Sequence, residues 1–157
     1  MAASPHELQN YIGYPFRDPE ILTEALTRRA YQNENPNQKK FMNALAILGD
    51  AVLSTIAVQK FYDEGKRDQK TLTEEKVLAV NRKNTRKFAK DHNLGHYIHW
   101  GKGEEKDETC KDSPRALDTV TEALIGAVYL DAEKNKKNGI TAVRDMLERL
   151  NFFNKDS

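Results

Sequence analysis

The sequence predicts an all-α fold, a bundle of six to eight helices formed by a single domain over residues 1–157. Strand signals are nearly absent, because no stretch alternates polar and apolar residues between turn pairs. Apolar residues instead recur at three- and four-residue steps in several segments, which is the spacing of one helix face. Hydrophobic residues make up 38% of the 157 residues, enough for a buried core. Glycine and proline fall between the periodic segments, where turns belong.

In chain order, start signals and apolar stripes predict six helices. Asp18 caps the second helix, with Pro19 in its first turn. Thr71 and Glu74 form a capping box that opens the fourth helix, and Ser113 precedes the proline that opens the fifth. The third and fifth helices have the longest apolar stripes, so we expect them to pack at the centre. The predicted helices cover residues 5–11, 20–31, 41–62, 71–92, 113–133 and 140–150.

Charge and cysteine content limit the classes of partner and compartment. The 25 basic and 24 acidic residues give a net charge of +1, so nucleic-acid binding would need a local patch. The one cysteine, Cys110, cannot form an internal disulfide, which is typical of a reducing compartment. No signal peptide is visible, and the apolar segment 41–59 carries Asn43 and Asp50, which are costly in lipid. We expect a protein of the cytoplasm or an organelle matrix, with no membrane partner.

The two predicted central helices carry carboxylates among apolar residues. Asp50 and Glu122 each lie in a run of small and aliphatic residues that includes a glycine. Asp118 lies four residues before Glu122, on the same helix face. Carboxylates that converge from two packed helices could hold Mg²⁺ or Mn²⁺, which prefer oxygen ligands. From spacing alone, an aspartate can equally cap a neighbouring helix, pair with an arginine such as Arg115, or lie at the solvent edge.

Several segments, in order along the chain, resemble the ribonuclease III family. Residues 45–53, LAILGDAVL, are similar to the family's signature helix, and residues 118–131, DTVTEALIGAVYLD, to its second acidic helix. The entry segment FRDPEIL at 16–22 and GKGE at 101–104 extend the resemblance over most of the chain. It implies a helical bundle that dimerises through the signature helix. It also implies hydrolysis of double-stranded RNA by carboxylates that hold magnesium.

The chain departs from the family pattern at three acidic positions. The family has acids at relative positions zero, three and seven of the signature helix, which are Asn43, Ala46 and Asp50 here. Its second helix has an aspartate three residues before the glutamate, where this chain has Thr119. Asp118 lies one residue further back and remains on the same face, so it is an imperfect substitute. The resemblance thus assigns three catalytic residues and metal ligands, Asp50, Asp118 and Glu122, in a weakened site.

A run of basic residues predicts contact with RNA. Between positions 76 and 90 there are six basic residues and no acidic residue. Lys83, Arg86, Lys87 and Lys90 share one face of the predicted helix, where they would contact phosphates independently of sequence. The alternative is an ordinary solvated helix face.

Three functions remain open from the sequence. The first is a magnesium-dependent endoribonuclease that works on double-stranded RNA as a homodimer, with Phe41, Met42, Leu45 and Ile47 at the interface. The second is a noncatalytic ribonuclease III-like module that binds structured RNA or scaffolds a ribonucleoprotein. The third is a helical dimer with no RNA role. No double-stranded-RNA-binding domain is expected after residue 150.

Overall fold

The computed structural model describes residues 2–153 and confirms the all-α fold. Within these residues, the one pairing of strand type is an isolated parallel bridge between Thr27 and His99. The same residues form nine α-helices, seven of them with eight residues or more, and two short 3₁₀ helices. The α-helices are α1 (Pro5–Ile12), α2 (Pro19–Leu26), α3 (Arg29–Glu34), α4 (Met42–Asp63), α5 (Gln69–Val80), α6 (Arg82–Asp91), α7 (Lys102–Glu105), α8 (Pro114–Lys134) and α9 (Gly139–Arg149).

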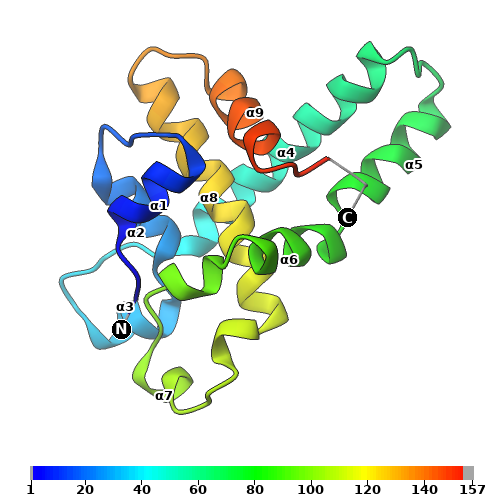
Figure 1. Cartoon of the computed structure of the whole chain (residues 1–157). Coiled ribbons are helices and arrows are strands. Elements are labelled where there is room, and N and C mark those ends of the chain that lie inside the picture. Colours follow the sequence, from blue (N-terminus) through cyan, green and yellow to red (C-terminus); the bar gives the residue numbers. More distant parts are fainter. Residues whose placement is uncertain (1, 154–157) are drawn as a thin grey trace.

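Helices α4 and α8 cross at the centre of the molecule, as expected from their apolar stripes (Figure 1). Helix α8 also contacts α2, α6 and α9, and its side chains Leu117, Leu124 and Val128 are fully or almost fully buried. The C-terminal end of α4 continues beyond this core and pairs with α5, so the two form an arm (Figure 1). By length and composition alone α4 could cross a membrane, a property that core helices of soluble proteins share.

At the crossing of α4 and α8, backbone meets backbone. A Cβ atom on Gly49 would lie 2.7 Å from the carbonyl carbon of Glu122 and nearer still to its oxygen. A Cβ atom on Gly126 would overlap the carbonyl oxygen of Leu45. A side chain at either position would therefore force the helices apart.

The predicted helix over residues 20–31 is interrupted at Thr27 and Arg28, where the chain leaves α2 before it becomes helical again in α3. Thr27 is extended, and its carbonyl oxygen accepts a hydrogen bond from the Met42 N–H at 2.9 Å. The Arg28 N–H donates to the carbonyl oxygen of His99 at 3.2 Å, and the His99 N–H donates to Leu26 at 2.8 Å. These partners come from distant parts of the chain and replace the hydrogen bonds of a continuous helix.

The predicted helix over residues 71–92 is also divided, into α5 and α6. Asn81 between them is extended, and its side chain accepts a hydrogen bond from the Asn84 N–H at 3.0 Å, which caps α6. Helix α5 begins two residues before the predicted start. Its cap is Asp68, which accepts from the Thr71 N–H at 3.0 Å, and so the predicted capping box is wrong.

Two of the four residues expected at a dimer interface lie inside the chain's own core. Met42 and Leu45 are 0% and 3% exposed, because they are on the side of α4 that faces the rest of the bundle. Ile47 is 75% exposed, and Phe41 is half-buried. The assignment of Met42 and Leu45 to an interface is therefore wrong, and Phe41 and Ile47 remain.

Because backbone meets backbone at Gly49 and Gly126, one added methyl group should lower stability strongly. Gly49→Ala should lower the free energy of unfolding by about 3 kcal/mol, because its Cβ overlaps the backbone of α8. Gly103→Ala is the matched control, since nothing lies within 4 Å of its Cβ position. Urea unfolding of both variants measures the difference. Equal stability of the two variants would contradict the backbone contact.

Candidate functional site: an acidic pair where two helices cross

Asp50 of α4 and Glu122 of α8 form a carboxyl pair next to the glycine crossing. Their side chains share a hydrogen bond. Asp50 is exposed and Glu122 is half-buried, so the pair lies at the edge of the core rather than within it. The pairing follows from the backbone contact, because Gly49 precedes Asp50 and faces the peptide group of Glu122. The structure thus brings together two of the three predicted acidic residues.

The environment of Glu122 favours its neutral form. Burial raises the pKa of Glu122 from 4.5 to about 7, together with the hydrogen bond to Asp50 and the negative charges of Asp50 and Asp118. The positive charge of Arg82 acts in the opposite direction. Two carboxylates so close repel each other when both are ionised, so a proton or a cation between them is favoured.

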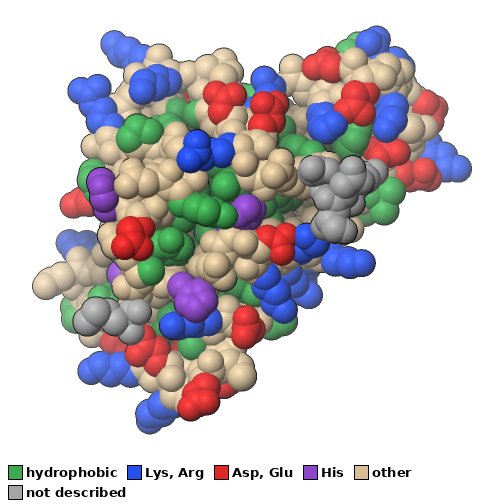
Figure 2. Space-filling model, in the orientation of Figure 1, with side chains coloured by type: hydrophobic (Ala, Val, Ile, Leu, Met, Phe, Trp, Pro, Cys, Tyr) green, Lys and Arg blue, Asp and Glu red, His purple; other side chains and the backbone are tan. Residues whose placement is uncertain are grey.

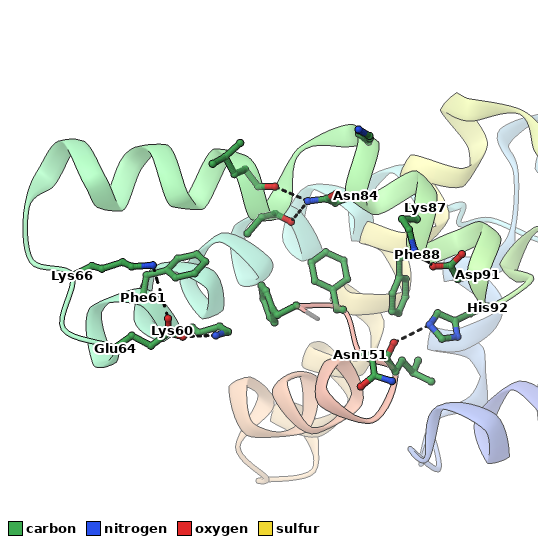
Figure 3. A pocket seen from close by; sticks show the side chains of 16 residues that line it. Lys60, Phe61, Glu64, Lys66, Asn84, Lys87, Phe88, Asp91, His92 and Asn151 are labelled. Carbon is green, nitrogen blue, oxygen red and sulfur yellow. Dashed lines mark hydrogen bonds and ion pairs between the residues drawn. The ribbon is translucent and has the colours of Figure 1, made fainter. Parts of the chain in front are cut away.

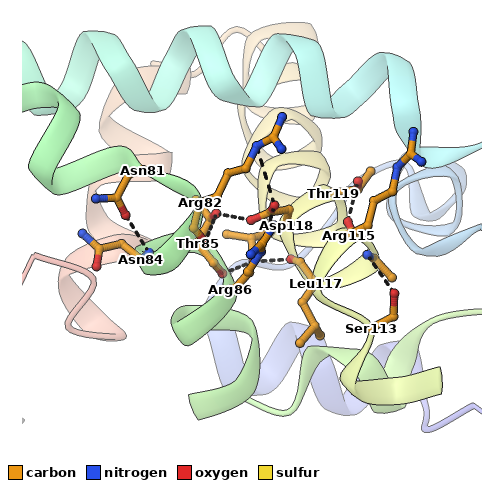
Figure 4. Close-up of polar contacts among 12 residues, drawn as sticks. Asn81, Arg82, Asn84, Thr85, Arg86, Ser113, Arg115, Leu117, Asp118 and Thr119 are labelled. Atoms are coloured by element: carbon orange, nitrogen blue, oxygen red, sulfur yellow. Dashed lines mark hydrogen bonds and ion pairs between the residues drawn. The ribbon is translucent and has the colours of Figure 1, made fainter. Parts of the chain in front are cut away.

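Asp118, the third predicted acidic residue, is directed towards α6 (Figure 4). Its Oδ1 accepts a hydrogen bond from the Thr85 hydroxyl at 2.6 Å, and its Oδ2 accepts from Arg86 Nε at 3.2 Å. Arg82 Nε lies 4.0 Å from the same Oδ2. Asp118 is 7% exposed, so its carboxylate is shielded from water, whereas the side chain of Arg86 is 38% exposed. Its charge still acts on Glu122, which places Asp118 beside the acidic pair as well as against α6.

The predicted RNA-contacting residues all lie on α6. Lys83, Lys87 and Lys90 are exposed, and Lys87 Nζ is 2.6 Å from a carboxylate oxygen of Asp91. Arg86 is half-buried because it pairs with Asp118. Figure 2 shows lysine and arginine side chains gathered over the part of the surface that α6 forms. A local basic patch, which nucleic-acid binding by a chain of near-neutral net charge would need, is present on α6, and its contact with RNA stays a prediction.

A family model described as Ribonuclease-III-like matches residues 18–149. This chain belongs to the ribonuclease III family. It is 37% identical over 136 residues to Ribonuclease 3 1 of a Nostoc species, an alignment that covers 86% of this chain and 58% of that protein. It is 35% identical over 152 residues to Ribonuclease 3 of Limosilactobacillus reuteri, with 93% of this chain and 62% of that protein covered. The chain therefore spans about three fifths of the length of these curated relatives.

Solved structures give the same result for the fold. A nuclease domain of ribonuclease III from Campylobacter jejuni, described for structural flexibility in the region involved in dimer formation, matches with a TM-score of 0.82 and 28% identity. The match covers 98% of this chain and all of that one. A second structure of the Campylobacter jejuni nuclease domain matches with a TM-score of 0.78, over 98% and 97% of the two chains. The chain thus has the fold of a ribonuclease III nuclease domain.

Three of the positions that hold acids in the ribonuclease III family contribute no carboxylate here. Asn43 is exposed, and Ala46 and Thr119 are half-buried. The Thr119 hydroxyl donates a hydrogen bond to the carbonyl oxygen of Arg115 at 2.9 Å, within its own helix. Uncharged side chains at these positions leave fewer negative charges to attract a cation.

The acidic pair fits one divalent ion. Among residues 2–153, no group of three or more His, Cys, Asp or Glu side chains is placed to hold a metal ion. Mg²⁺ is, however, often held by one or two carboxylates and water. Asp50 and Glu122 meet this requirement, and a cation between them would relieve the repulsion between their negative charges. The assignment of all three acids as ligands, with Asp118 included, stays a prediction.

The GKGE segment at 101–104 serves as a structural junction. Glu104 accepts hydrogen bonds from Arg28 Nη2 at 2.6 Å and from the Gly101 N–H at 3.1 Å. Burial raises the pKa of Glu104, but the hydrogen bonds from Arg28 and Gly101 outweigh it and hold that pKa below its usual value. The Lys102 N–H donates to both carboxylate oxygens of Glu34, at 2.8 and 3.0 Å. These contacts join α3 to α7.

One buried carboxylate was missed by sequence reasoning. Asp131 of α8 is 1% exposed and accepts hydrogen bonds from the Tyr14 hydroxyl at 2.6 Å and from the Arg17 and Asp18 N–H groups at 3.1 and 3.0 Å. It therefore fastens the segment between α1 and α2 to the central helix. Burial and the contact with Asp131 raise the pKa of Tyr14 above its ordinary range. The available signal was an aspartate at the end of the apolar stripe of α8.

The raised pKa of Glu122 makes stability depend on pH. Between about pH 4.5 and about pH 7 the folded state binds more protons at Glu122 than the unfolded state, so the free energy of unfolding should fall as pH rises. Glu122→Gln removes this titration and should flatten that part of the profile. Glu148→Gln, an exposed change on α9, is the matched control. Urea unfolding at several pH values tests it, and equal profiles for both variants would contradict the assignment.

Proposed function

We propose that this chain acts on double-stranded RNA as a ribonuclease III-like endonuclease domain with a weakened magnesium centre. The observation that carries the proposal is the pair formed by Asp50 and Glu122, each from one of the two helices that resemble the family's acidic helices. The pair lies at the edge of the core, where a phosphate group can approach Asp50 from solvent.

Asp50 and Glu122 would hold Mg²⁺ or Mn²⁺, with Asp118 as the proposed third acid. An ion held there would activate a water molecule and stabilise the charge that develops at the scissile phosphate. Glu122 has a pKa of about 7, so it must lose its proton before it can act as a ligand, and occupancy should increase with pH. The lysines of α6 bind the phosphates on either side and position the duplex without reading its sequence.

A second function is a noncatalytic module that binds structured RNA or scaffolds a ribonucleoprotein. It is favoured by the uncharged residues at three family positions, Asn43, Ala46 and Thr119. It is also favoured by the ion pair that Asp118 makes with Arg86, which occupies an acid that a metal would otherwise use. Binding to RNA through α6 requires no metal ion, so this function survives the loss of the centre.

Long duplex RNA with and without magnesium separates the two functions. We expect slow cleavage that needs high magnesium and disappears in Glu122→Gln, which keeps the shape of the side chain but loses its charge. Ala46→Glu should increase cleavage, because position 46 lies one helical turn before Asp50, and adding Thr119→Asp should increase it further. Thr55→Glu, an exposed change elsewhere on α4, is the matched control. Gel electrophoresis of the products measures the rates.

One result would favour the noncatalytic module over RNA hydrolysis. If the Ala46→Glu and Thr119→Asp variants remain inert with magnesium and manganese while duplex RNA still binds, hydrolysis fails as the proposed function. The noncatalytic module would then be the better account.

We also infer that the domain is a homodimer. Ile47 is 75% exposed on α4, and Phe41, the N-cap residue of the same helix, is half-buried. A second copy of the chain would cover this surface. Ile47→Glu should therefore shift sedimentation at micromolar concentration from a dimer to an 18.0 kDa monomer. Glu148→Gln on α9 should leave the dimer intact, and a wild-type protein that sediments as a monomer would contradict the inference.

A further inference from the structure

A cavity lies beside α6, and neither residue of the acidic pair lines it. It is bordered by the ends of α4 and α5, by α6, and by the residues that follow α9 (Figure 3). Its volume is about 500 Å³, within the range of small-ligand sites. None of the predicted acidic residues lines it. We call it the aromatic–lysine cavity, after the side chains described below.

One part of the aromatic–lysine cavity is built from phenylalanine rings. Four phenylalanines line it: Phe61 and Phe88 are 5% and 4% exposed, and Phe152 and Phe153 are half-buried. The ring centres of Phe88 and Phe152 lie 5.3 Å apart, and those of Phe152 and Phe153 lie 5.0 Å apart. Half-buried rings offer apolar surface on which a planar group can stack.

The rest of the lining is basic. Four lysines and two acids line the cavity, and Lys60 and Lys66 are ion-paired with Glu64, with Lys66 also 3.5 Å from Glu75. The positive charge available to an anion is therefore centred on α6. Lys87 pairs with Asp91 at 2.6 Å, whereas Lys83 is exposed one turn before it on the same helix. The lining lysines are Lys60, Lys66, Lys83 and Lys87, and the lining acids are Glu64 and Asp91.

Helix α6 separates this cavity from the acidic pair. Arg82 and Arg86 lie on the flank that faces Asp118, and Lys83 and Lys87 lie on the flank that borders the cavity. Because neighbouring residues of a helix are about 100° apart around its axis, the two flanks are adjacent faces of α6. A strand whose phosphates cross α6 would therefore meet the acidic pair on one side and the cavity on the other.

We propose that the aromatic–lysine cavity binds one unpaired nucleotide of the RNA, with its base against the phenylalanine rings and its phosphate at Lys83 and Lys87. The combination of stacking surface and positive charge is the chemistry that single-stranded nucleic acid requires. A paired base has both faces covered by its neighbours in the helix, so only an unpaired base can enter. This inference rests on the proposed action on RNA and adds a preference for duplexes that carry unpaired nucleotides.

Binding to two RNAs tests the preference, measured by fluorescence anisotropy in EDTA so that nothing is cleaved. One RNA is a blunt duplex, and the other is the same duplex with three unpaired adenosines at one 3′ end. The wild-type chain should bind the second about tenfold more tightly, the scale of one stacked base. Phe153→Leu, which removes the ring and keeps apolar volume, and Lys83→Gln should each reduce the preference below about threefold. Lys137→Gln, at an exposed lysine between α8 and α9, should leave it unchanged.

The experiment gives two measurements, and each tests a different proposal. Affinity for the blunt duplex reports on the proposed function, and the ratio of the two affinities reports on the cavity. Equal affinities in the wild-type chain, or a ratio that neither variant lowers, would overturn the inference. If neither RNA binds, titration with adenosine monophosphate and with inorganic phosphate decides. Binding of the nucleotide that Phe153→Leu weakens supports the cavity, whereas no binding, or equal binding of phosphate alone, overturns it.

Discussion

The contact between the backbones of α4 and α8 determines where the acidic pair of the proposed site is located. Because Gly49 and Gly126 have no side chains, the peptide group of Glu122 can lie directly against α4. Asp50 follows Gly49, so its carboxyl group reaches that of Glu122 and shares a hydrogen bond with it. A methyl group at the crossing would separate the helices and the carboxyl groups together. Stability and the geometry of the acidic pair therefore depend on the same two glycines.

The electrostatics around the acidic pair differ from those of a site lined only by acids. Arg82 and Arg86 of α6 lie against Asp118, and the charge of Arg82 lowers the pKa of Glu122 while its other neighbours raise it. Part of the negative charge is thus neutralised by the chain itself. This neutralisation lowers the attraction for a divalent cation and at the same time makes the surface more favourable for phosphate. The same contacts therefore weaken the proposed hydrolysis and strengthen the proposed RNA binding.

The parts of the fold that local sequence determines could be predicted, and the parts that long-range contacts determine could not. The stripes of α4 and α8 and their small residues correctly indicated the central pair. The break at Thr27 depends on hydrogen bonds with Met42 and His99, which no local pattern reveals. Similarly, the spacing of apolar residues in α4 did not show that Met42 faces the core and Ile47 faces solvent. Asp118 was placed on the correct helix, but its pairing with Thr85 and Arg86 required the position of α6.

The break at Asn81 has the largest consequence for function. A continuous helix over residues 71–92 would carry its basic residues as one stripe along an extended rod. Ending α5 at Val80 and restarting the chain as α6 lets the second helix lie against α8, where Thr85 and Phe88 become buried. Successive residues of α6 are about 100° apart around the helix axis. Once the helix is packed, Arg86 therefore pairs with Asp118, while Lys83 and Lys87 border the aromatic–lysine cavity on the adjacent face. The asparagine cap thereby divides one basic run between two surfaces, one beside carboxylates and one beside aromatic rings, and these are the two places where we propose that phosphates bind.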